Sequence, residues 1–150
     1  MRSGVRLSLD IGKARVGAAR CDPDGIMAFP IETIPRDVAM DRAVELVTEF
    51  NPCEVIIGNP VNLQNNDTES THDSRDFASS LSVRIGIPVR MVDERLTTTA
   101  ALGALRASGR NAKNSRAVVD QVAAVILLQS CLDAERSGRI LGEIVEVPHG

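Results

Sequence analysis

Three acidic residues stand where their carboxylates could hold metal ions. Asp10 ends the alternating run "LSLD", Glu94 follows the apolar run "PVRMV", and Asp120 lies within "AVVDQVAAVILLQ". Carboxylate oxygens are the ligands that Mg²⁺ and Mn²⁺ prefer, and two such ions can promote hydrolysis of a phosphodiester. Spacing alone leaves ordinary explanations open: Asp10 as a turn cap, Glu94 as a solvated loop acid and Asp120 as a salt-bridged helix residue.

Asp120 is the acid with the most apolar surroundings. Its helical neighbours three, four, seven and eight positions on are Ala123, Ala124, Leu127 and Leu128. Burying a lone ionised carboxylate costs free energy unless it is paired or binds a cation. A bound metal ion would remove that cost.

Glycines and cations follow Asp10 at once. Gly12 permits a positive φ in a tight hairpin and a close approach of the backbone to a ligand, and Gly17 follows in the next predicted strand. Lys13 and Arg15 place positive charge beside the acid, where a phosphate could bind. The same residues also fit a plain hairpin with exposed cations.

A basic segment contrasts with the net charge of −3. From residue 95 to residue 119 there is no acidic side chain, and this segment is expected to contact a nucleic-acid backbone or to form a solvated helical hairpin. Its positive residues are Arg95, Arg106, Arg110, Lys113 and Arg116.

The elements that must position these residues follow from periodicity. Strands are predicted over 5–10, 16–21, 26–34, 54–58 and 88–92, and helices over about 37–51, 71–85, 98–107 and 115–136. Asp37 and Ser115 are the expected N-caps, Gly86 is the expected helix stop, and Pro30 should lie on an edge strand or at a bulge. This order predicts an α/β fold with a mixed five-stranded sheet flanked by helices, whose strand ends gather ligands.

The bulk composition indicates one globular domain over residues 1–150, with a tail from about 138 that either adds a strand or is mobile. No apolar stretch is long enough for a membrane span or resembles a signal peptide, so we expect a cytoplasmic protein without a membrane partner. Cys21, Cys53 and Cys131 form no metal or disulfide pattern and are expected in the core. His72 and His149 lie near no serine or cysteine motif, which disfavours a Ser-His hydrolase.

Three stretches resemble the signatures of the YqgF/RuvX family: "DIGKARVGAARCDPDG", "VDERLTT" and "VVDQVAAVILLQSCLD". The resemblance runs in order over roughly residues 5–135 and implies an RNase H-like fold. It implies that Asp10, Glu94 and Asp120 bind Mg²⁺ or Mn²⁺ as the catalytic trio, and that Arg15 or Arg95 steadies phosphate charge.

The resemblance also implies a function. It indicates a metal-dependent endonuclease in 5′-end maturation of precursor 16S rRNA, with ribosomal particles as further partners. The oligomeric state stays open between a monomer and a homodimer. Alternatives are a Holliday junction resolvase that acts on branched DNA and a non-catalytic ribosome-assembly factor. An actin-like ATPase shares the opening hairpin but needs two lobes. The chain departs from the family pattern at Lys13, at Asn59 and at Asn65.

Overall fold

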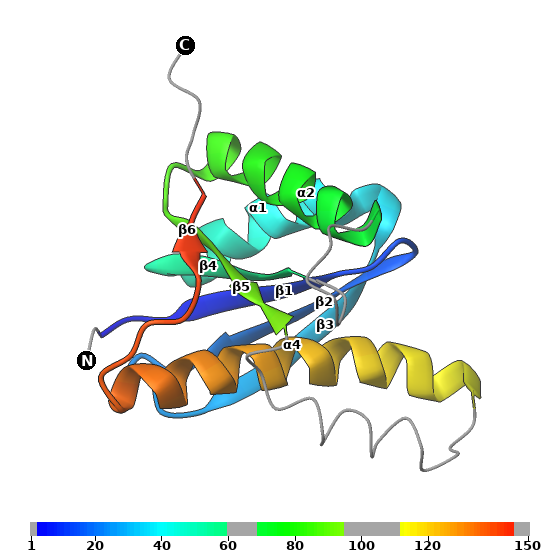
Figure 1. The fold of residues 1–150 in the computed structure, drawn as a ribbon. Coiled ribbons are helices and arrows are strands. Elements are labelled where there is room, and N and C mark those ends of the chain that lie inside the picture. The colour runs from blue at the N-terminus through cyan, green and yellow to red at the C-terminus, as the bar shows by residue number, and fades with distance from the viewer. Residues whose placement is uncertain (1–2, 60–68, 95–111, 146–150) are drawn as a thin grey trace.

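The protein is described by a computed structural model that covers residues 3–59, 69–94 and 112–145, with side chains over 3–59, 72–94 and 121–145. The expected α/β class is confirmed, since one mixed sheet lies between helices (Figure 1). The strands are β1 Arg6–Ile11, β2 Arg15–Cys21, β3 Ala28–Pro35, β4 Glu54–Asn59, β5 Val89–Asp93 and β6 Glu143–Ile144. The helices are η1 Arg36–Val38, a 3₁₀ turn, α1 Ala39–Phe50, α2 Glu69–Ile85 and α4 Ala112–Arg136.

The strands lie in the order β3-β2-β1-β4-β5-β6. The first three strands form an antiparallel meander, and β4 and β5 run parallel to β1. Strands β1, β4 and β5 therefore end at the same edge of the sheet. Residues at these three ends come together there, as expected for ligand sites in such sheets.

The two faces of the sheet bury different cores. Helices α1 and α2 cover one face, and α4 covers the other (Figure 1). Leu9 of β1 packs with Leu46 of α1 and Leu81 of α2 on the first face. Ile56 of β4 packs with Leu128 of α4 on the second. Full burial of each of these side chains stabilises the fold by roughly 1.5–3 kcal/mol.

Strand β3 is an edge strand, as Pro30 predicts. Its pairing with β2 shifts register between Ala18 and Ala19, whose partners are Glu32 and Pro30. Proline has no N–H to donate to a ladder, so it is tolerated at an edge or an irregularity. Pro30 therefore lies both on an edge strand and at a register irregularity, the two positions that the sequence predicts for it.

The expected start of the first helix is wrong. Asp37 lies within η1, and α1 begins at Ala39 after Val38, which makes no side-chain capping bond. The backbone N–H of Arg36 donates to the carbonyl of Ala14 at 3.0 Å. This bond holds the chain beside the β1–β2 hairpin, so the first turn is a 3₁₀ helix and Asp37 caps nothing.

Helix α4 also begins earlier than predicted, at Ala112, so Ser115 lies inside the helix instead of capping it. The intervening Ala and Lys are good helix formers and extend the helix backwards. Gly86, with φ of 68°, follows the last residue of α2 and confirms the predicted stop. The helix expected over 98–107 lies outside the described residues. No helix in the described ranges combines the length and apolarity that a bilayer crossing requires.

The tail adds a sixth strand, which corrects the predicted count of five. Glu143 and Ile144 of β6 pair antiparallel with Met91 and Arg90 of β5. Gly142 precedes them with φ of 77°, and a Cβ at that position would collide with the carbonyl of Met91. A two-residue strand is too short to leave a periodic pattern in the sequence, so its pairing decides its structure.

The cysteines are free, and two of the three are in the core. Cys21 and Cys131 are buried, as expected, whereas Cys53 is exposed and corrects that prediction. Cys53 follows Pro52 in the short connection from α1 to β4, where only its backbone N–H is held, by the carbonyl of Val5 at 2.8 Å. None of these thiols lies in the region of Asp10.

The edge where β1 and β4 begin buries two ion pairs that the sequence did not predict. Arg6 contacts Glu135 of α4 at 2.6 Å, with side chains only 1% and 8% exposed. Arg90 contacts Glu54 at 3.3 Å. Burial, and then the charge of Glu54, raise the pKa of the neighbouring Cys131 thiol to about 12. The Arg6–Glu135 pair joins the start of β1 to the end of α4, and the Arg90–Glu54 pair joins β5 to the start of β4.

Candidate active site

Asp10 lies on the face of β1 that α4 covers. On this face the Ser8 hydroxyl donates a hydrogen bond to the carbonyl of Ala124 at 2.7 Å, and Arg6 pairs with Glu135. Side chains alternate along a strand, so Asp10 follows Arg6 and Ser8 on the same face. The half-buried Asp10 therefore faces α4 at the carboxyl end of the central strand.

Two glycines flank Asp10. Gly17 of β2 lies directly opposite it in the antiparallel register. On the other side Ser8 is level with Ile56 of β4, so Gly58 follows at the level of Asp10. Neither neighbour has a side chain on this face. The space beside the Asp10 carboxylate is consequently left open by both adjacent strands.

The carboxylate of Glu94 lies over Gly58. Glu94 comes directly after β5, two positions beyond Val92, which is buried against α4 and level with Gly58. A Cβ built on Gly58 would lie 2.6 Å from Oε1 of Glu94 and 3.2 Å from its carboxyl carbon. Strand β4 separates β5 from β1, so the Glu94 carboxylate lies over the strand next to Asp10. Gly58 is a site residue that was not predicted, and its signal in the sequence is a glycine at the end of the buried run "EVIIG".

Asp120 belongs to helix α4, one turn before Ala124, and its side chain lies outside the described part of the chain. Helix α4 runs antiparallel to β1. Arg6 at the start of β1 contacts Glu135 near the end of α4, whereas Ser8, later in β1, contacts Ala124, which lies earlier in α4. Four residues of helix span about 6 Å, and two residues of strand span about 7 Å. From the Ser8 contact with Ala124, the backbone at Asp120 therefore falls at the level of Asp10.

The described donor set fits a hard divalent cation. Asp10 and Glu94 offer carboxylate oxygens only, and Gly58 leaves room above β4 for the Glu94 carboxylate, which any Cβ at that position would displace. Oxygen-only sets suit Mg²⁺ and Mn²⁺ in preference to softer metals. Among the residues whose side chains are described, no group of three or more metal-binding side chains is complete. Asp120, the third acid of the expected trio, has its side chain outside the described residues.

The turn after Asp10 depends on Gly12. Its N–H donates to the carbonyl of Arg15 at 2.9 Å, and a Cβ on Gly12 would lie 2.7 Å from the same oxygen. The expected positive φ is not observed at Gly12, so close approach is the reason for this glycine. Lys13 is exposed and Arg15 is half-buried, which places both cations in the hairpin beyond Asp10.

Arg36, which was not among the predicted site residues, fixes this hairpin. Its Nη1 donates to the carbonyl of Gly12 at 2.8 Å, and both terminal nitrogens contact the Asp73 carboxylate of α2 at 2.7 Å. The guanidinium also lies over the Phe77 ring, 5.4 Å from its centre. These hydrogen bonds hold the pKa of Asp73 below its ordinary value. Arg36 thereby ties the hairpin to α2. These contacts join residues that are distant in the sequence, so no local sequence pattern predicts them.

The remaining predicted cations belong to the basic segment over 95–119. Arg95, Arg106 and Arg110 lie outside the described residues, as does Asn65. Lys113 and Arg116 belong to the first turns of α4, and their side chains lie outside the described set. Their contacts with a substrate stay predictions.

Comparisons with known proteins identify the family. Residues 4–134 match the family model described as "RuvX: Holliday junction resolvase". A Streptomyces coelicolor protein named "Putative pre-16S rRNA nuclease" is 51% identical, over 98% of this chain and 91% of that protein. A protein of the same name from Clavibacter michiganensis is 50% identical, over 91% of this chain and 88% of that protein.

A solved structure shares the fold. Thermus thermophilus RuvC in complex with a Holliday junction substrate superposes with a TM-score of 0.63 at 15% identity, covering 93% of this chain and 99% of that one. This likeness confirms the RNase H-like architecture. Because the family model spans nearly the whole chain and relatives of similar length share half of its residues, this protein is a member of the RuvX family.

Proposed function

We propose that this protein is a divalent-metal-dependent endonuclease that hydrolyses phosphodiester bonds in precursor 16S rRNA. The observation that carries the proposal is the Glu94 carboxylate over Gly58, on the strand beside Asp10. The substrate class is supported by the names of relatives that share half of the sequence. A substrate of this kind would be met in the cytoplasm and at ribosomal particles, so the proposal includes both.

Asp10, Glu94 and Asp120 are the residues that would hold Mg²⁺ or Mn²⁺. When bound, such ions supply positive charge to phosphate oxygens and lower the pKa of a water molecule. Asp10 is central in this arrangement because β1 lies between β2 and β4. Gly17 places no side chain beside Asp10 on the β2 side, and Gly58 leaves room for the Glu94 carboxylate over β4.

The hairpin supplies the second part of the mechanism. Lys13 and Arg15 bring positive charge to the end of β1, where it balances the charge of the RNA backbone. Arg36 fixes the turn against α2, so these cations keep a constant position relative to Asp10. The proposed RNA-binding surface continues with Arg95, Arg106, Arg110, Lys113 and Arg116 of the basic segment.

The test is cleavage of a precursor 16S rRNA fragment and of a four-way DNA junction, with Mg²⁺, Mn²⁺ or EDTA. Wild type is compared with Asp10→Asn and Asp120→Asn, and Asp133→Asn is the matched control. Asp133 lies on the same helix as Asp120 with a side chain 55% exposed. We expect metal-dependent RNA cleavage that falls roughly a hundredfold or more in the first two variants and is unchanged in the control.

Each contrary outcome has a definite meaning. Absence of cleavage of both substrates contradicts the nuclease function and favours a non-catalytic assembly factor. Full activity in Asp10→Asn contradicts the assignment of Asp10 to the metal site. Preferential cleavage of the DNA junction contradicts the RNA assignment. It would instead support a resolvase, the activity that the family's description states.

A further inference from the structure

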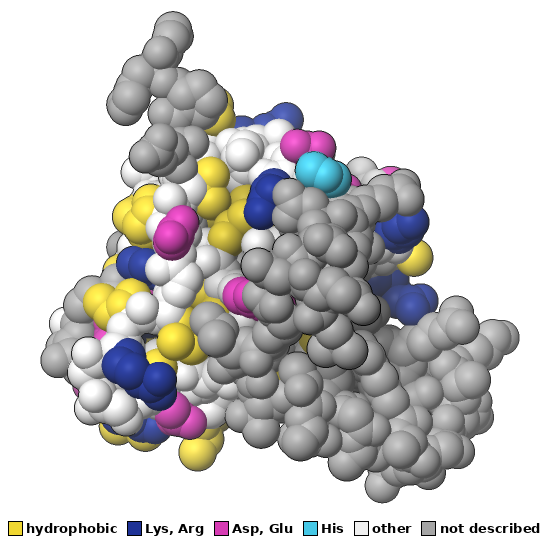
Figure 2. Space-filling model, in the orientation of Figure 1, with side chains coloured by type: hydrophobic (Ala, Val, Ile, Leu, Met, Phe, Trp, Pro, Cys, Tyr) yellow, Lys and Arg dark blue, Asp and Glu magenta, His cyan; other side chains and the backbone are white. Residues whose placement is uncertain are grey.

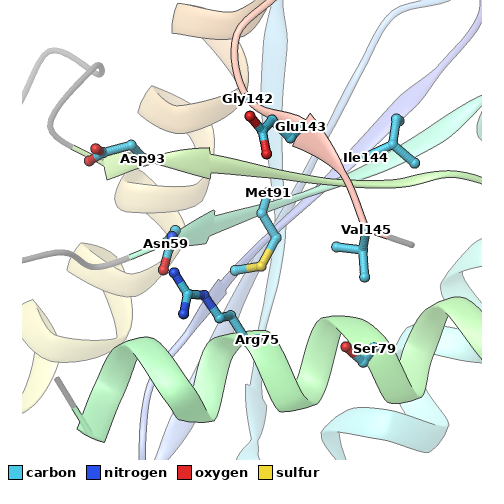
Figure 3. A pocket seen from close by; sticks show the side chains of 9 residues that line it. All are labelled: Asn59, Arg75, Ser79, Met91, Asp93, Gly142, Glu143, Ile144 and Val145. Atoms are coloured by element: carbon cyan, nitrogen blue, oxygen red, sulfur yellow. The ribbon is translucent and has the colours of Figure 1, made fainter. Parts of the chain in front are cut away.

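A pocket of about 560 Å³ opens on the face of the sheet opposite α4, between α2 and the β5–β6 edge (Figure 3). Its volume is in the range of pockets that hold small organic ligands. The proposed catalytic mechanism uses none of its side chains. The lining residues used below are Asn59, Arg75, Met91, Asp93, Glu143 and Val145.

The polar end of this pocket adjoins the candidate active site. Asn59 ends β4 and is level with Asp93, the last residue of β5. Glu94 is the next residue, and its carboxylate lies on the other face of the sheet, over Gly58. A nucleic-acid strand with a phosphate at Glu94 would therefore have a neighbouring nucleotide within reach of the pocket across this edge.

Asn59 presents an unused hydrogen-bonding atom there. Its Oδ1 is buried and has no hydrogen-bond partner among the described residues. In Figure 3 the Arg75 side chain extends from α2 toward the Asn59 amide. A buried amide oxygen without a partner costs free energy, and an N–H donor from a ligand would remove that cost. A side-chain amide is also the group that pairs with the edge of a base.

The remaining lining favours an uncharged ring over a phosphate. Two acidic residues, Asp93 and Glu143, line the pocket together with one arginine, Arg75, so the lining offers no excess of positive charge to a further anion. Met91 and Val145 supply apolar surface, and Figure 2 shows hydrophobic side chains beside acidic ones on this face. A planar heterocycle with N–H donors matches both features.

We propose that this pocket takes one unpaired nucleobase of the RNA, next to the phosphate that is cut. The inference rests on the proposed nuclease function and adds a subsite to it. The base lies against Met91 and Val145, and an N–H on its edge donates to Oδ1 of Asn59. Arg75 lies beside the base, as arginine does where proteins take up bases of unpaired RNA.

Methionine methyl groups provide a direct probe. The chain has four methionines, and of these Met91 lines the pocket, whereas Met27 is an exposed residue of the β2–β3 turn and Met40 lies in α1. Protein with ¹³C-labelled methionine methyls is titrated in EDTA with a mixed-sequence single-stranded RNA pentamer. The same titration is run with pentamers that carry one abasic ribose, and with free nucleoside monophosphates.

We expect the Met91 signal to move with the pentamer while Met27 and Met40 stay in place, and one abasic position should abolish the shift. A stationary Met91 signal at millimolar pentamer overturns the proposal. So does a shift that no abasic position affects. Tighter binding of a free mononucleotide than of the pentamer also overturns it, since the pocket would then be a mononucleotide site.

Substitutions test the named contacts. Asn59→Leu removes the acceptor at similar size and should weaken pentamer binding roughly two- to tenfold. Arg75→Gln should weaken it as well, whereas Arg84→Gln on the same helix should not, because Arg84 is 54% exposed and pairs with Asp41. Equal effects of the two arginine variants would contradict the subsite. Thermal melting of each variant checks that it is folded.

The subsite and the nuclease can fail separately. A Met91 shift with an abasic-sensitive position, but without cleavage in Mn²⁺, would leave the subsite and remove the nuclease function. Cleavage with a stationary Met91 signal would support the nuclease function and contradict the subsite. The binding measurement contains no metal, so it does not depend on catalysis.

Discussion

Oε1 of Glu94 lies 2.6 Å from the point that a Cβ on Gly58 would occupy. The position of the carboxylate therefore depends on the absence of a side chain one strand away. Gly58→Ala should displace the flexible end of Glu94 and lower metal-dependent RNA cleavage roughly 10- to 100-fold, because residues that orient a metal ligand have effects of that size. Initial rates against Mn²⁺ concentration would measure the loss.

A double variant isolates the cause. In Glu94→Ala the colliding side chain is gone, so adding Gly58→Ala should change the remaining activity very little. If the two substitutions lower activity independently, Gly58 acts through something other than Glu94. Urea unfolding of all three variants controls for a general loss of stability.

Arg36 should affect substrate binding more than turnover. Arg36→Lys keeps the charge but cannot contact Asp73 with two nitrogens and the Gly12 carbonyl in the same fork geometry. We expect KM for the RNA to rise roughly tenfold, with kcat changed less, because the loosened hairpin carries the phosphate-binding cations.

Arg42→Lys is the matched control for this change. Arg42 is similarly exposed and contacts Glu32 at 2.6 Å, but it lies on α1 away from the hairpin. Its KM should equal that of the wild type. A larger effect on kcat than on KM in Arg36→Lys would contradict a positioning role in substrate binding.

The Arg36–Asp73 pair should make stability depend on acid pH. The guanidinium lowers the pKa of Asp73 in the folded protein below the unfolded value of 3.8, so the stabilisation is complete above that value. It is lost as pH falls through the lower, folded-state pKa. The difference in unfolding free energy between wild type and Asp73→Asn should therefore shrink as pH falls below about 4. A constant difference from pH 6 to pH 2 in urea unfolding would contradict the assignment.

The buried pair Arg6–Glu135 should be costly to break from one side. Arg6→Met leaves the 8%-exposed Glu135 carboxylate without its partner and should destabilise the fold by about 3–5 kcal/mol. Arg6→Met with Glu135→Leu should recover most of that loss.

The exposed pair Arg84–Asp41 is the control for this prediction, and Arg84→Met should change stability by less than about 1 kcal/mol. Urea unfolding compares the four proteins. Equal losses in the Arg6 single and double variants would show that packing of the arginine, and not its charge, carries the stability.

The sequence predicts the site residues whose placement follows from their position within a single strand or helix. Asp10 and Glu94 end apolar runs, and parallel strands bring such ends to one edge, so their proximity follows from periodicity and topology. Asp120 follows from its helical spacing to Ala124. The strands near the centre of the sheet were placed within two residues for the same reason, because their side chains are buried in an alternating or continuous pattern.

Other parts depend on contacts between distant segments. Gly58 matters through a side chain on a different strand, and Arg36 matters through Gly12 and Asp73, which local patterns do not connect. The expected cap at Asp37 fails for the same reason, since a backbone bond to the hairpin decides how that helix starts. The position of strand β6 depends on its pairing with β5 and on Gly142. Its two residues are too few to show an alternating pattern in the sequence.

The two borders of the sheet make it a poor template for strand addition. Along β3, Pro30 and Pro35 offer no N–H to an approaching chain, and the register shift against β2 interrupts the ladder. At the other border, β6 presents only two residues. The apolar central strands are therefore shielded from the edge-to-edge pairing that leads to fibrils. Association of two copies through a continuous sheet is disfavoured for the same reason.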